Sequence, residues 1–142
     1  MLGHLYESQD CSAARALELV GERWSLLILR DAMFRGHKRF SEFEKTLQIA
    51  PNILSKRLAG FVEAGLMTLE AGEYRVTRKG LELKTALIAL TNWGDKWVTP
   101  GPIGFIGAVD GARIGLRVVD ETGRDIDVED ITVIPVDRVP AE

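Results

Sequence analysis

The chain has 142 residues, 46% of them hydrophobic, and a formal net charge of −3 at pH 7. This length buries one ordinary hydrophobic core with a small appended unit, which excludes a second full-sized domain. No apolar run approaches the roughly 18–20 residues of a membrane span and no secretion signal is visible, so we expect a cytoplasmic protein. The chain has one cysteine, Cys11, which excludes an internal disulfide.

The charge is unevenly distributed along the chain. Residues 1–98 carry 14 Lys and Arg against 12 Asp and Glu, a balance of +2, whereas residues 99–142 carry 4 against 9, a balance of −5. Within the first part, residues 23–79 hold 11 basic and 6 acidic residues, a balance of +5. Local fields govern contact with phosphates, so the acidic whole-chain balance does not exclude a nucleic-acid partner.

Two helices are predicted before residue 35. The first covers residues 12–20 and ends at Gly21, with a predicted buried stripe of Ala13, Ala16, Leu17 and Val20. The second covers residues 24–34 and is apolar around most of its surface, which is typical of a helix at the centre of a core.

Two further helices follow a polar loop. Ser41 and Glu44 predict a capping box at the start of a short helix that ends at residue 47 or 48. Pro51 suits the first position of the next helix, which Gly65 ends. Its apolar residues Leu54, Leu58, Phe61 and Val62 face inward, so Asn52, Ser55 and Lys56 point outward together, flanked by Arg57.

Two short strands, 67–70 and 74–77, are predicted with a tight turn between them. Thr77 is the expected N-cap of one long final helix to about residue 98, whose two apolar stripes favour pairing with another subunit. Pro100-Gly101-Pro102 marks a domain boundary. Beyond it, residues 103–109, 112–119 and 131–134 predict strands of a small acidic β-meander.

The predicted elements follow the order found in a winged helix-turn-helix, which holds one helix in the DNA major groove. They are a short helix, a Pro-initiated helix with a polar face, and a hairpin. The expected fold class is α+β. Residues 1–99 would form the winged-helix DNA-binding and dimerisation domain with a long C-terminal dimerisation helix, and residues 100–142 an appended acidic β-rich extension.

Several motifs occur in a characteristic order: Cys11 followed by Gly21, Arg23 and Trp24; Arg39-Phe40-Ser41-Glu42-Phe43; Leu54-Ser55-Lys56-Arg57-Leu58; Tyr74 through Gly80; and Trp93-Gly94-Asp95-Lys96-Trp97. In this order they resemble the HxlR-type family of winged-helix transcriptional regulators. The resemblance implies a homodimer held by the N-terminal and last long helices, with two recognition helices in successive major grooves of a pseudo-palindromic operator. The wing is shorter than is usual in the family, and residues 100–142 lie outside its pattern.

The candidate DNA-binding residues form two groups. Asn52, Ser55, Lys56 and Arg57 lie on the predicted recognition helix, where Asn can bond adenine and Lys or Arg can reach guanine or phosphate; an ordinary solvated helix face is the alternative. Lys38, Arg39 and Arg75 are expected to contact phosphates rather than bases, and ordinary surface charge is the alternative. For Arg39 the resemblance supports this role, because an Arg-Phe pair opens this helix in the family.

Cys11 is a candidate redox sensor, because several members of the family sense oxidants or electrophiles with a cysteine at this place. A helix start favours the thiolate and Asp10 opposes it, so inert packing is the alternative. His4 and His37 are far apart and lack a cysteine partner, so we expect surface histidines, no metal site and no cofactor. Trp24, Trp93 and Trp97 are expected in the core and interface, with a small-molecule effector pocket between the last helix and the dimer body as the other reading.

The sequence as a whole predicts a sequence-specific DNA-binding transcriptional regulator, more usually a repressor in such families, whose operator affinity responds to a small-molecule or redox signal. No catalytic triad spacing, Gly-rich phosphate loop or paired-carboxylate motif is present, so we do not expect an enzyme. The alternative is a winged-helix protein-interaction module, in which the acidic C-terminal meander docks a partner or covers the basic surface.

Overall fold

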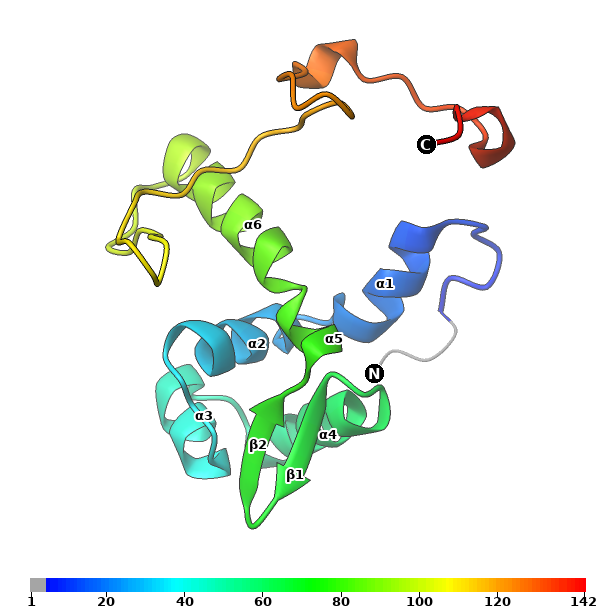
Figure 1. The fold of residues 1–142 in the computed structure, drawn as a ribbon. Coiled ribbons are helices and arrows are strands. Elements are labelled where there is room, and N and C mark those ends of the chain that lie inside the picture. The colour runs from blue at the N-terminus through cyan, green and yellow to red at the C-terminus, as the bar shows by residue number, and fades with distance from the viewer. Residues whose placement is uncertain (1–4) are drawn as a thin grey trace. The chain divides into compact units, whose positions relative to one another are not determined.

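The computed structural model describes residues 5–142 and divides them into two units that meet between Thr99 and Pro100. The N-terminal unit contains the helices and a two-stranded antiparallel hairpin (Figure 1). Its elements are α1 (Ser12–Val20), α2 (Ser25–Phe34), α3 (Phe40–Leu47), α4 (Pro51–Glu63), β1 (Met67–Glu70), β2 (Glu73–Val76), α5 (Arg78–Leu81) and α6 (Lys84–Trp97). The C-terminal unit holds two 3-10 turns, Val128–Asp130 and Val136–Arg138.

The core lies between α2, α3 and α4. Ile28 and Leu29 of α2 are fully buried, as are Phe43, Leu54 and Leu58 from α3 and α4. Complete burial of one such side chain stabilises the folded state by about 1.5–3 kcal/mol. The predictions of α2 as the central core helix and of the inward face of α4 are confirmed.

The start of α3 differs from the prediction. The helix begins at Phe40, so Ser41 lies inside its first turn and the predicted capping box with Glu44 is wrong. The Glu42 carboxylate instead accepts hydrogen bonds from the backbone N–H groups of Arg39, at 2.9 Å, and Lys38, at 3.2 Å. These N–H groups have no partner within the helix, so a carboxylate one turn further on satisfies them.

The hairpin turn has two residues. Ala71 and Gly72 both have positive φ, +50° and +77°, as a type I′ turn requires. This turn sets the pairing of Glu70 with Glu73 and, at the far end, of Met67 with Val76. The strand β2 therefore begins one residue earlier than the sequence predicts.

The predicted long helix after Thr77 is interrupted. Thr77 caps only the four-residue helix α5, accepting from the Gly80 N–H at 3.2 Å while its hydroxyl donates to the Gly65 carbonyl at 2.6 Å. The Leu83 N–H donates to the Gly80 carbonyl at 3.1 Å, a tightened last turn that ends α5. The chain then restarts at Lys84 as the 14-residue α6.

Apolar side chains remain uncovered on α1 and α6. Of the predicted buried stripe of α1, Val20 is buried, whereas Leu17 is 46% exposed and Ala13 and Ala16 are exposed with it, so the prediction is wrong for these three within a single chain. In α6 the buried residue is Leu87, whereas Leu90, Trp93 and Trp97 are 54%, 58% and 65% exposed. Within residues 5–142, none of the helices has the length and hydropathy that crossing a membrane requires.

The C-terminal unit does not form the predicted strands. Residues 100–142, all within the described part of the chain, contain isolated antiparallel bridges between Ile106 and Arg113 and between Val119 and Asp125. None of these residues is buried. Isolated two-stranded pairings are marginally stable in water, and no buried side chain within residues 100–142 supports the two bridges.

Candidate nucleic-acid interface

The outward face of α4 carries Asn52, Ser55 and Lys56, all exposed. These residues lie opposite Leu54 and Leu58, whose complete burial fixes the rotation of the helix about its axis. Pro51 occupies the first turn, which contains no acidic residue, so the positive end of the helix dipole is uncompensated there. The face therefore combines polar side chains with a field that attracts phosphate.

Arg57 lies apart from these three residues. Its side chain is 17% exposed and forms an ion pair with Glu22, which is 9% exposed and lies in the turn between α1 and α2. The sequence predicts Arg57 beside the outward face, but its side chain is directed toward the body of the domain. The pair fastens α4 to the turn that follows α1.

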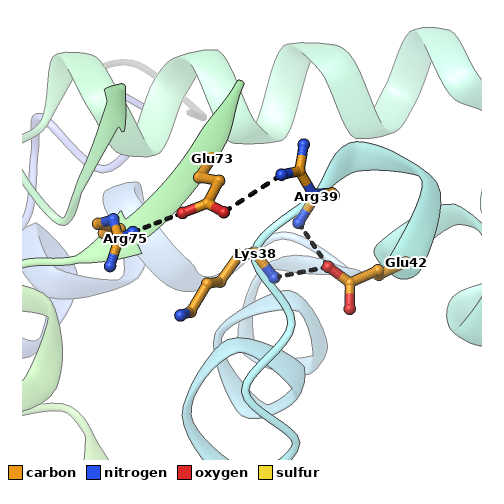
Figure 2. Close-up of polar contacts among 5 residues, drawn as sticks. All are labelled: Lys38, Arg39, Glu42, Glu73 and Arg75. Atoms are coloured by element: carbon orange, nitrogen blue, oxygen red, sulfur yellow. Dashed lines mark hydrogen bonds and ion pairs between the residues drawn. The ribbon is translucent and has the colours of Figure 1, made fainter. Parts of the chain in front are cut away.

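A second group of cations lies beside β2 of the hairpin. Figure 2 shows Glu73 between Arg39 and Arg75: Glu73 Oε1 lies 3.3 Å from Arg39 Nη2, and Glu73 Oε2 lies 2.5 Å from Arg75 Nη2. The Tyr74 N–H donates to the Lys38 carbonyl at 2.7 Å, which holds Lys38 beside β2. Thus the structure brings together Lys38, Arg39 and Arg75, which are up to 37 positions apart in the sequence.

Glu73 belongs to this group but was missed by the sequence analysis. Residues two apart in a strand point to the same face, so Glu73 and Arg75 on one strand already indicate an ion pair. The contribution of Arg39, which precedes α3, is not visible from the sequence. One carboxylate thus partly neutralises two arginines whose side chains are 59% and 54% exposed.

Glu42 is the second acidic residue near these cations. Hydrogen bonds from the backbone N–H of Arg39, and then of Lys38, lower the pKa of its carboxyl group below the ordinary value for glutamate. The carboxylate therefore stays ionised and keeps the start of α3 in place, with Arg39 as the residue that precedes the helix.

Cys11 lies at the surface, whereas His37 is partly buried. Cys11 precedes the first residue of α1 and is exposed, which removes the alternative of a thiol packed inside a single chain. His37 is 19% exposed, bonds Thr46 Oγ1 through Nε2 at 2.9 Å and packs its ring edge-on against Phe43, so the prediction of a surface histidine is wrong there. His4 lies outside the described residues.

Comparison with known proteins identifies the family. Residues 19–102 match the family model described as HxlR-like helix-turn-helix, which spans more than half of the chain. The chain belongs to the HxlR-like helix-turn-helix family. It is 44% identical over 110 residues to the uncharacterized HTH-type transcriptional regulator Rv3095 of Mycobacterium tuberculosis H37Rv, covering 72% of this chain and 67% of that protein.

Two solved structures resemble this HxlR-like chain. PA1607, described as a candidate transcription factor, is 36% identical with a TM-score of 0.79, covering 90% of this chain and 96% of that one. Quinone-bound YodB of Bacillus subtilis is 28% identical with a TM-score of 0.55, covering 60% of this chain and 97% of that one. The HxlR-like chain is a DNA-binding regulator of transcription, and its resemblance to PA1607 extends beyond the family segment.

Proposed function

We propose that this HxlR-like regulator is a cytoplasmic homodimer that binds a specific operator with one α4 helix per subunit in the major groove. The observation that supports this most directly is the exposed set Asn52, Ser55 and Lys56 on a helix whose opposite face is completely buried. A recognition helix needs this combination, because its side chains can be read only if the helix is held in one orientation.

The residues would divide into base contacts and phosphate contacts. Asn52 can make two hydrogen bonds with adenine, Lys56 can reach guanine or a phosphate, and Ser55 can serve either. Lys38, Arg39 and Arg75 would bind phosphates flanking the groove and set the register of the protein on the duplex.

Arg57 has a different role in this proposal. To reach DNA its guanidinium would have to leave Glu22, and separating a largely buried pair is strongly unfavourable. We assign to Arg57 the positioning of α4 rather than a direct contact with DNA. An Arg57→Lys substitution keeps the charge but loses the planar geometry of the guanidinium, so it should weaken operator binding through the orientation of α4.

The exposed apolar residues of α1 and α6 support the homodimer. Leu17 on α1 and Leu90, Trp93 and Trp97 on α6 leave apolar surface that a single subunit does not cover. Burying them between two copies, through the N-terminal and last long helices, would hold the two α4 helices at a fixed separation. Operator half-sites one helical turn apart require about 34–36 Å between the centres of the two readers.

We propose repression by occupancy of the operator, with a signal that alters the separation of the α4 helices. Cys11 is a candidate sensor of oxidants or electrophiles, because it is exposed beside the first turn of α1 and because YodB, a relative, has been solved with a bound quinone. If so, Cys11→Ser should keep operator binding and lose its release by a quinone. Equal release from both proteins would restrict Cys11 to a structural role.

The test of DNA binding is footprinting of genomic fragments, first those upstream of the protein's own gene. Lys56→Glu should abolish protection while sedimentation still gives a dimer. Lys84→Glu, the same charge change at the start of α6, is the matched control and should retain protection. Protection that survives Lys56→Glu would show that α4 is not the recognition helix.

A winged-helix module that binds another protein is the second candidate. Residues 99–142 carry the balance of −5, and residues 100–142 contain 13 Val and Ile yet bury none of them, a composition unlike that of a disordered tail. Failure to retain any specific DNA fragment at low salt, with a dimeric and folded protein, would favour this module.

A further inference from the structure

A cavity of about 240 Å³ lies in the N-terminal unit, between the end of α2, the loop that follows it, β2 and α5. Ala32, Met33, Val76 and Leu81 supply its apolar lining, while Lys38 and Arg75 supply cations at its edge. No Asp or Glu lines it among the residues that the structure describes. The cavity is therefore apolar with a positive rim.

Its walls are held by contacts within one domain. The Tyr74 N–H donates to the Lys38 carbonyl at 2.7 Å and joins the loop to β2. Gly36, with φ of +70°, turns the loop away from the end of α2, and the His37 ring is fixed by Thr46 and Phe43. The backbone at Lys38 and beside Arg75 is thereby held at the same cavity, and both cationic side chains are exposed there.

Both cations retain hydrogen-bonding capacity. The Lys38 ammonium group forms no ion pair within residues 5–142. The Arg75 guanidinium donates to Glu73 through Nη2, and an arginine has five N–H donors, so others remain for a further acceptor. The rim can thus take one more anion without removing Glu73.

We propose that this cavity binds a small aromatic carboxylate, with the ring against the apolar lining and the carboxylate between Lys38 and Arg75. Charge complementarity identifies the anion, because Lys38 and Arg75 are among the described residues that line the cavity and no Asp or Glu is. The volume lies below the roughly 300–1,000 Å³ of pockets for drug-sized ligands, which limits the occupant to about one ring. A carboxylate is also the planar acceptor that a guanidinium binds best.

This inference rests on the proposed function for its consequence. The same Lys38 and Arg75 are assigned to DNA phosphates, so a bound carboxylate would neutralise them directly. Each lost phosphate contact reduces the slope of log K against log salt by about 0.9. Loss of two contacts in each subunit would reduce the slope by about 3–4 for a dimer, and operator affinity would fall.

The experiment measures calorimetric binding of benzoate to the full chain at constant ionic strength, with benzamide as a neutral ligand of the same shape. Benzoate should bind at least tenfold more tightly than benzamide. Lys38→Gln should weaken benzoate binding at least fivefold, whereas Lys45→Gln, the same change on the exposed side of α3, should not. Equal binding of the two ligands, or an unchanged affinity in Lys38→Gln, would overturn the proposal.

A cavity-filling variant separates this site from general charge effects. Leu81→Trp occupies the cavity without altering either cation, so it should lose benzoate binding and keep operator binding; Ala32→Leu serves the same purpose if Leu81→Trp does not fold. If benzoate binds both filled variants with the affinity that it has for the parent protein, it binds elsewhere, and the proposed site is refuted. Operator binding without any benzoate binding refutes this inference alone, while benzoate binding without any operator binding refutes the proposed function alone.

Discussion

Glu73 should limit the affinity of this regulator for DNA. Its carboxylate lies 3.3 Å from the Arg39 guanidinium and 2.5 Å from that of Arg75, the two arginines proposed to contact phosphates (Figure 2). The substitution Glu73→Gln removes the charge and keeps the size and shape of the side chain. We expect tighter binding to the operator.

The magnitude follows from Coulomb's law. A carboxylate about 6 Å from a phosphate repels it by about 0.7 kcal/mol in a water-like dielectric. Two subunits give about 1.4 kcal/mol, or roughly a tenfold lower Kd at low salt, and screening reduces the gain as ionic strength rises. One additional effective cation per subunit, or two per dimer, should also steepen the slope of log K against log salt by about 1.8. Exposed ion pairs contribute about 0–1 kcal/mol to folding, so the stability of the domain should change little.

Fluorescence anisotropy with an operator duplex at several salt concentrations measures both quantities. Glu70→Gln is the matched control, because Glu70 pairs with Glu73 across the hairpin and is exposed. Its substitution should change the affinity less, since the structure places no arginine in an ion pair with Glu70 within residues 5–142. Weaker binding by Glu73→Gln would refute the reasoning and show that Glu73 orients the arginines for DNA rather than competing with it.

Three predictions concern the scaffold. Gly80→Ala should lower the free energy of unfolding by about 1–3 kcal/mol in urea titration, because an added Cβ would lie 2.3 Å from the Leu66 carbonyl oxygen. Gly94→Ala in α6 is the control: its added Cβ would meet open space, so the substitution should not be destabilising. Ala71→Gly should raise the melting temperature, since φ of +50° is unfavourable for alanine by about 1–2 kcal/mol. Glu42→Gln should lower the free energy of unfolding at pH 7. The loss should become smaller as pH falls below about 4.3, because backbone N–H groups lower the pKa of the Glu42 carboxyl in the folded state and protonation removes the stability that they give. A loss that is the same at every pH would exclude that cause.

The periodicity of apolar residues was sufficient to predict which face of α4 is buried and which is exposed. The inward positions of α4 follow a 3.6-residue repeat, so Leu54 and Leu58 are buried and Asn52, Ser55 and Lys56 are exposed as predicted. The tight turn at Gly72 likewise follows from local backbone preferences. These features depend on residues within one or two turns of each other, which a sequence pattern records directly.

Several features that the sequence did not predict depend on contacts between distant residues. Arg57 looks like another polar residue of α4, and only the fold brings it to Glu22, 35 positions earlier. The short helix α5 before α6 packs Gly80 against the Leu66 carbonyl, a contact that no helical periodicity indicates. The sequence shows an apolar stripe on α1, but periodicity does not indicate whether residues of the same chain or of a second subunit cover that stripe.

The ion pair between Arg57 and Glu22 gives the proposed regulation a short physical route. Leu17 of α1 is among the residues proposed to meet the second subunit, and α1 ends at Val20, two residues before Glu22. A rotation of α1 at the dimer interface would therefore move the carboxylate that holds Arg57, and Arg57 lies one residue after Lys56 on the proposed recognition helix. Because side chains in a packed interior yield little, such a displacement would shift α4 as a body rather than be absorbed locally.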